Sequence, residues 1–146
     1  MTPGSSAPAS LLGHTLGHYR VVEAIGAGGM GEVYLARDEH LHRDVAIKVL
    51  PADGLRDEDD RRHLRKEALA LSRLNHPSIE TVFDFDTQDG VDFLVMEYIP
   101  GTTLSDLVED GPLPESMLLE LATQLVEGLA SAHEAGVIHR DLKPAT

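Results

Sequence analysis

Residues 25–36 read IGAGGMGEVYLA, a cluster of glycines followed by a stretch that alternates like a β-strand. The glycines with the spacing G-x-G-x-x-G are Gly26, Gly28 and Gly31. A dinucleotide-binding fold needs a helix after this pattern, and a P-loop needs a lysine where Glu32 stands. The pattern therefore predicts the tip of a β-hairpin, whose backbone N–H groups could approach phosphate oxygens because glycine has no Cβ. A merely flexible turn is the alternative.

Strand patterns continue on both sides of this hairpin. The predicted strands cover residues 19–25, 32–37, 43–50, 79–86 and 91–98. The first three are joined by connections too short for crossover helices, so they should form antiparallel hairpins. A helix is predicted over residues 58–74, because its acid-rich start suits the positive end of the helix dipole.

The last third of the chain has a helical pattern. After the breaker Pro100-Gly101, a short helix is predicted over residues 103–109 and a long one over residues 114–135. The apolar stripe of the long helix consists of Leu118, Leu121, Ala122, Leu125, Leu129 and Ala132, widened by Leu119 and Val126. The order of elements predicts an α+β protein with a small sheet lobe joined to a helical lobe. Residues 1–17 are predicted to be a disordered leader, because their first part is rich in Pro, Ser, Ala and Gly.

Composition excludes several classes of function. A net charge of −13 argues against general binding to nucleic acid or anionic membranes. The chain has no cysteine, so it has neither disulfides nor thiolate sites. No apolar run approaches the ~20 residues that span a bilayer, and no secretory signal is recognisable, so a cytoplasmic location is expected. His14 and His18 are four residues apart but lack a third ligand, which favours surface or capping roles over zinc.

Two charged residues stand at positions that their neighbours mark as apolar. Lys48 shares one face of its predicted strand with Ala46 and Leu50, where a lysine is costly to bury unless it is paired. An edge lysine that reaches water is the alternative. Glu67 falls on the apolar side of its helix, where only His63 could pair with it locally. Glu67 therefore either reaches solvent or meets a cation from elsewhere, for which Lys48 is the candidate.

Four motifs now stand in one order along the chain: the glycine hairpin, Val45-Ala46-Ile47-Lys48, Glu67, and His139-Arg140-Asp141-Leu142-Lys143-Pro144. Together they resemble the eukaryotic-type protein kinase family, and GAGGMGEVY, LNHPSI, LVMEYIPGTTL and HRDLKPA are most similar to its bacterial serine/threonine branch. The resemblance implies a kinase-like fold in which a five-stranded antiparallel N-lobe with one main helix covers residues 18–96. A hinge would follow at 97–101, and the first helices of a helical C-lobe at 102–146, ending in the catalytic loop.

The resemblance also implies a site for ATP and Mg²⁺. Lys48, oriented by Glu67, would hold the α- and β-phosphates. Asp141 would orient the proton of the substrate hydroxyl, and Lys143 would meet the γ-phosphate. Thr146 stands where the family has an asparagine that helps to hold Mg²⁺, and a threonine hydroxyl is shorter and points differently.

The remaining residues of the implied nucleotide site surround the phosphates and the adenine. Those of the glycine loop are Gly26, Ala27, Gly28, Gly29, Met30, Gly31 and Glu32. Ile25, Val33 and Ala46 would sandwich the adenine, with Met96 at the back of the pocket. Backbone groups of Glu97 and Ile99 would hydrogen-bond the adenine edge.

Two hypotheses follow for the function. The first is a protein serine/threonine kinase whose catalytic domain is cut short, since no Asp-Phe-Gly motif follows the catalytic loop in this sequence. Its substrates would be proteins with serine or threonine hydroxyls, and this fragment alone would be inactive. The second is a non-catalytic nucleotide-binding or interaction module that pairs with another kinase as a dimer partner. Loss of packing around the long helix should cost about 7–15 kcal/mol, so we expect poor folding beyond residue 100, or aggregation.

Overall fold

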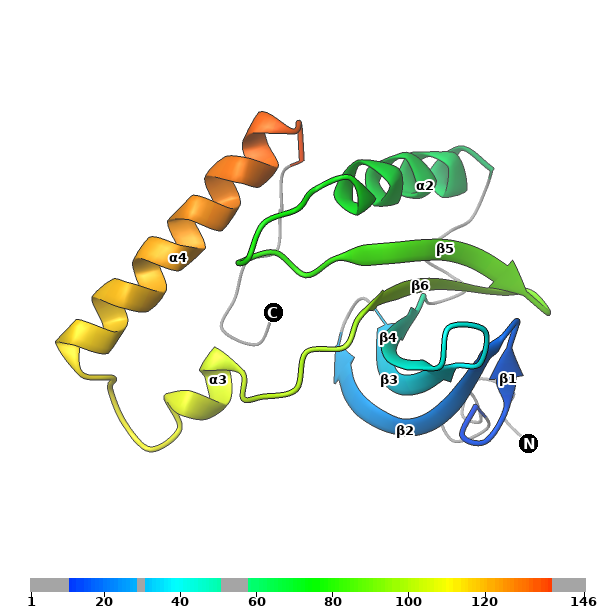
Figure 1. Ribbon diagram of the computed structural model, residues 1–146, viewed down its shortest axis with the longest axis horizontal. Coiled ribbons are helices and arrows are strands. Elements are labelled where there is room, and N and C mark those ends of the chain that lie inside the picture. The colour runs from blue at the N-terminus through cyan, green and yellow to red at the C-terminus, as the bar shows by residue number, and fades with distance from the viewer. Residues whose placement is uncertain (1–10, 29–30, 51–57, 138–146) are drawn as a thin grey trace. The chain divides into compact units, whose positions relative to one another are not determined.

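The computed structural model describes residues 11–28, 31–50 and 58–137 (Figure 1). The contacts divide the chain into two compact units. The first unit comprises residues 1–69 and 82–98 and contains the sheet. The second comprises residues 70–81 and 99–146. The first unit thus ends at Tyr98, and residues 70–81 group with the second unit although they lie between two parts of the first in the sequence.

The sheet of the first unit has six strands in the order β1-β2-β3-β4-β6-β5, and every neighbouring pair is antiparallel. The strands are β1 (Thr15–Leu16), β2 (Tyr19–Gly28), β3 (Gly31–Asp38), β4 (Arg43–Val49), β5 (Val82–Gln88) and β6 (Val91–Glu97). Five of them correspond to the five predicted strands. A two-residue turn joins β5 to β6 through Asp89 and Gly90, both with positive φ, as a tight hairpin requires.

The sixth strand, β1, corrects two predictions. The sequence predicted five strands and a disordered leader over residues 1–17, but Thr15 and Leu16 pair with Arg20 and Tyr19. Gly17, with φ of 61°, makes the tight turn between the two strands possible, and the Leu16 side chain is buried in the core. A two-residue strand is too short to show alternation, so the sequence pattern could not reveal it.

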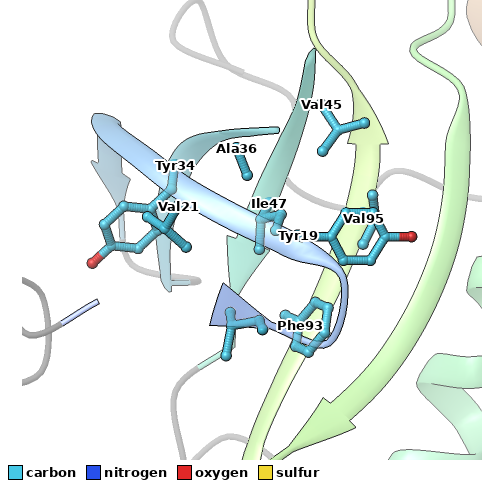
Figure 2. Packing of buried hydrophobic residues seen from close by; sticks show 9 residues of the cluster. Tyr19, Val21, Tyr34, Ala36, Val45, Ile47, Phe93 and Val95 are labelled. Carbon is cyan, nitrogen blue, oxygen red and sulfur yellow. The ribbon is translucent and has the colours of Figure 1, made fainter. Parts of the chain in front are cut away.

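The core of the first unit lies on one face of the sheet (Figure 2). Its members include Tyr19, Val21, Tyr34, Ala36, Val45, Ile47, Phe93 and Val95. On β4, the core residues Val45 and Ile47 alternate with Ala46 and Lys48. The side chains of Ala46 and Lys48 therefore point to the other face of the sheet, as the sequence predicted. We call that second face the Lys48 face, defined by Lys48 and its in-register neighbours Val33, Leu94 and Phe85.

Three helices complete the described chain: α2 (Glu58–Ser72), α3 (Leu104–Leu107) and α4 (Glu115–Glu134). The Thr103 side chain caps α3 by accepting a hydrogen bond from the N–H of Asp106 at 3.1 Å. Helix α4 ends before Gly136, whose φ of 82° lets the chain leave the helix. Within the described residues, no helix is both long and apolar enough to cross a membrane.

Candidate functional site

The glycine motif is the tip of the β2–β3 hairpin. Gly28 pairs with Gly31, Ala27 with Glu32 and Gly26 with Val33, so strand continues into strand across the motif. This register confirms the hairpin prediction and excludes a strand–turn–helix motif. Gly29 and Met30 lie outside the described residues.

Several residues of the implied adenine site are cross-strand neighbours. Ala46 on β4 is buried and pairs with Met96 on β6, and Val33 on β3 pairs with Lys48. The β2–β3 register shifts between Ala24 and Gly26, and Ile25, which lies in that irregularity, is 41% exposed. The sheet thus brings Val33, Ala46 and Met96 to neighbouring positions next to Lys48. Glu97 is the last residue of β6, and Ile99 belongs to the second unit.

Lys48 and Glu67 do not form the predicted ion pair in this conformation. The Glu67 carboxylate instead lies 3.2 Å from Nε2 of His63, four residues earlier on α2. Within the described parts of the chain, no carboxylate lies within 4.0 Å of the half-buried Lys48 ammonium. The physical reason is local: His63 shares the helix with Glu67, and Glu67 is 46% exposed, so it needs no cation from the sheet.

Glu32, at the base of the glycine hairpin, is held by a tyrosine. The Tyr34 hydroxyl donates a hydrogen bond to Oε2 of Glu32 at 2.6 Å. Burial of Tyr34, together with this hydrogen bond and the negative charge of Glu32, raises the pKa of the tyrosine far above its ordinary value. Sequence reasoning did not identify the contact. The sequence did contain a signal for it, because Glu32 and Tyr34 are two positions apart on one strand and their side chains therefore lie on the same side of the sheet.

A second polar contact, between α2 and the β5–β6 hairpin, was also missed. Nη2 of Arg61 lies 3.3 Å from Oδ2 of Asp92, and the Thr87 hydroxyl donates to Oδ1 of Asp92 at 2.5 Å. The Asp92 side chain is only 6% exposed. The available signal was a carboxylate in the strand VDFLV, two residues before Leu94 on the Lys48 face.

The catalytic-loop residues Asp141 and Lys143 lie outside the described residues, as does the proposed metal ligand Thr146. Within residues 11–28, 31–50 and 58–137, no group of three His, Asp or Glu side chains could hold a metal ion. Of the residues implied by the resemblance, the structure thus describes most of the glycine hairpin, Lys48, and Val33, Ala46 and Met96 on β3, β4 and β6.

The fold and the site can now be compared with those of known proteins. The features to be matched are a half-buried lysine beside a glycine hairpin and a six-stranded antiparallel sheet followed by helices. The protein kinase domain family matches residues 19–146. The chain belongs to this family. The kinase domain of PknI from Mycobacterium tuberculosis superposes with a TM-score of 0.81 at 34% identity, covering 91% of this chain and 55% of that structure. The predicted kinase-like fold is thereby confirmed, with six strands in place of five.

The curated kinases similar to this chain include several from bacteria. The serine/threonine-protein kinase PknB of Mycobacterium leprae is 45% identical over 137 residues, which cover 90% of this chain and 22% of PknB. The serine/threonine-protein kinase PrkC of Bacillus subtilis is 41% identical over 129 residues, covering 88% of this chain and 20% of PrkC. This kinase chain thus spans about a fifth of the length of these relatives and about half of a solved kinase domain.

Proposed function

We propose that this chain forms the nucleotide-binding part of a protein serine/threonine kinase that transfers the γ-phosphoryl group of ATP to protein hydroxyls. The observation that carries the proposal is the position of Lys48. Lys48 is half-buried, its ammonium lacks a carboxylate within 4.0 Å among the described residues, and its strand neighbour Val33 pairs with Gly26 of the glycine hairpin. A partly desolvated cation without an anion gains from a negatively charged partner, so the site suits a polyanionic ligand.

The residues of the chain suit the parts of Mg²⁺-ATP in different ways. Lys48 offers a point charge to phosphate oxygens, and the glycine hairpin offers backbone N–H groups. Ala46 and Met96 offer an apolar surface for the base. Bound Mg²⁺ would neutralise charge on the phosphates, with Thr146 as the proposed protein ligand. The Glu67 carboxylate would orient Lys48 after it leaves His63 and pairs with the Lys48 ammonium.

The transfer step is proposed for the catalytic-loop residues. Asp141 would orient the hydroxyl of the substrate serine or threonine, and Lys143 would neutralise charge that develops on the γ-phosphoryl group. The proposed macromolecular partners are protein substrates and a second kinase molecule, with no nucleic acid, which the net charge of −13 disfavours. We propose a cytoplasmic site of action, where ATP is available.

The first prediction concerns ATP binding by Lys48. Titration of the 146-residue chain with Mg²⁺-ATP, followed by calorimetry, should show saturable binding. Lys48→Met should raise Kd about tenfold or more, because one charge-assisted hydrogen bond contributes about 1.5–3 kcal/mol. The matched control is Lys66→Met, a lysine on the exposed side of α2, which should leave Kd unchanged.

Measurements on the same variants distinguish the two hypotheses for function. Absence of saturable binding, or equal effects of both lysine variants, would contradict the proposed nucleotide site. Transfer from labelled ATP is then measured with the whole protein that contains this chain, with Asp141→Asn as the variant. Binding that depends on Lys48 without transfer that depends on Asp141 would support the non-catalytic module instead.

A further inference from the structure

Helix α2 is attached to the sheet by few apolar contacts. Of its fifteen residues only Ala68 is buried, and Leu69 is 52% exposed. The first ten residues, EDDRRHLRKE, contain one aliphatic side chain. Ala68, with the half-buried Leu64 and Leu71, supplies the apolar contacts of this helix, so the polar contacts of its first half carry more of its attachment.

Two arginines on one side of α2 provide these interactions. Arg61 and Arg65 are one turn apart, so their side chains project from the same side of the helix, as does Ala68. Arg61 contacts Asp92 at 3.3 Å, and the guanidinium of Arg65 lies over the ring of Phe85, 5.6 Å from its centre. Both contacts reach the β5–β6 hairpin, and Figure 1 shows α2 running beside β5.

Asp92 is the buried end of this attachment. Its side chain is 6% exposed, it accepts a hydrogen bond from the Thr87 hydroxyl, and its backbone carbonyl accepts one from the N–H of Leu50 at 2.9 Å. A buried carboxylate is costly without a cation. Among the described residues, Arg61 is the cation placed within 4.0 Å of it.

The attachment points lie on the Lys48 face of the sheet. Lys48 pairs with Leu94, and Leu94 pairs with Phe85, so these side chains form one row across β4, β6 and β5. Asp92 precedes Leu94 by two residues and therefore points to the same face. Arg61 and Arg65 thus dock α2 on the face that presents Lys48.

We propose that Arg61 is a positioning residue for the kinase reaction, because its contact with Asp92 holds α2 where Glu67 can turn from His63 to Lys48. The inference rests on the proposed function. The Glu67–His63 contact is a pair between partly exposed groups on one helix, and such pairs are weak and easily exchanged. The Arg61–Asp92 contact involves a buried carboxylate and is the more durable of the two.

The experiment combines amide hydrogen exchange with Mg²⁺-ATP binding in the 146-residue chain. Arg61→Ala should speed exchange across residues 58–72 and raise Kd about fivefold, a typical size for coupling between sites. Arg61→Lys, which keeps the charge, should restore part of both effects. The matched control is Arg62→Ala, since Arg62 is 77% exposed and lies 3.5 Å from Asp59, a residue of the same helix.

A second variant separates positioning from simple stabilisation. In the Glu67→Gln background, Arg61→Ala should no longer change Kd, because Arg61 acts through Glu67. If Arg61→Ala raises Kd by the same factor in the Glu67→Gln background as in the unsubstituted chain, the proposal is overturned. Equal amide exchange rates in the Arg61 and Arg62 variants would overturn it as well. If the unsubstituted chain does not bind ATP, the proposed function fails, and the exchange measurement alone decides whether Arg61 docks α2.

Discussion

At the scale of single residues, Asp38 is the most constrained charge in the sheet. It is 1% exposed, and its Oδ1 accepts hydrogen bonds from the N–H groups of His40 and Leu41 at 2.9 and 3.1 Å. Burial acts to raise the pKa of this carboxyl, but the N–H donors and the positive charges of His18 and Arg43 outweigh it, so the pKa lies below its ordinary value. The ionised form is therefore part of the folded state.

The sign of the pH dependence follows from this depressed pKa. The contribution of Asp38 to stability is present above the unfolded-state pKa of about 3.9 and is lost as pH falls through the folded-state value. Asp38→Asn should lower the free energy of unfolding by about 1–2 kcal/mol at pH 7 and flatten the decrease of that free energy as the pH falls below about 4. The measurement is urea unfolding at several pH values. Asp44→Asn, at a 54% exposed side chain, is the control, and an identical acid response in both variants would contradict the prediction.

At the scale of elements, the buried position of α4 is a glycine. Gly128 is the only buried residue of this helix among the described residues, and a Cβ built there would lie 3.3 Å from both Cβ and O of Ser78. Ile79 lies close by. The contact joins α4 to residues 70–81 inside the second unit, so the absence of a side chain at position 128 sets how near the two segments approach.

We therefore expect Gly128→Val to destabilise the second unit by about 1–3 kcal/mol, the usual range for overpacking. Helix propensity alone predicts the opposite sign, since valine is a better helix former than glycine. Helicity followed during thermal unfolding gives the measurement. The control is Ala122→Val, at an exposed position of the same helix. It should lower the free energy of unfolding only by the small difference in helix propensity between alanine and valine. A higher melting temperature for Gly128→Val would show that Ser78 moves aside without cost.

The elements differ in how well the sequence predicted them. The strands with four or more alternating residues were predictable, because a buried core face imposes period two on β4 and β6. The contact that attaches α2 to the sheet was not predictable from the sequence. Arg61 and Asp92 are thirty-one positions apart, and the sequence pattern around each one alone indicates a solvated charge. Lys48 and Glu67 were identified as unusual from their apolar neighbours. Their lack of contact was not predictable, because the sequence offers Glu67 two partners, His63 on its own helix and Lys48 on the sheet, and the structure shows the contact with His63.

At the scale of the whole molecule, the apolar side of α4 is exposed. Leu118, Leu119, Leu125 and Val126 are between 43% and 64% exposed, although the sequence places them in the apolar stripe of the helix. Contiguous apolar surface of this kind promotes association in water. The chain should therefore self-associate as its concentration rises, despite its net charge of −13.

Sedimentation velocity checks this expectation over a range of concentrations. Leu119→Gln combined with Val126→Gln should shift the distribution toward monomer, because both substitutions remove apolar area without changing charge. Leu69→Gln on α2 provides a comparison at a leucine that is 52% exposed but outside the stripe. A wild-type chain that stays monomeric throughout would refute the expectation.

The division into two units has a spectroscopic consequence. The chain has three tyrosines, three phenylalanines and no tryptophan, and all six rings lie within residues 1–69 and 82–98. Near-ultraviolet circular dichroism and tyrosine fluorescence therefore report on the first unit alone, while far-ultraviolet dichroism also contains the signal of the twenty-residue helix α4. Melting curves recorded in the two spectral regions distinguish, without any label, whether the sheet and the long helix unfold together or in separate transitions.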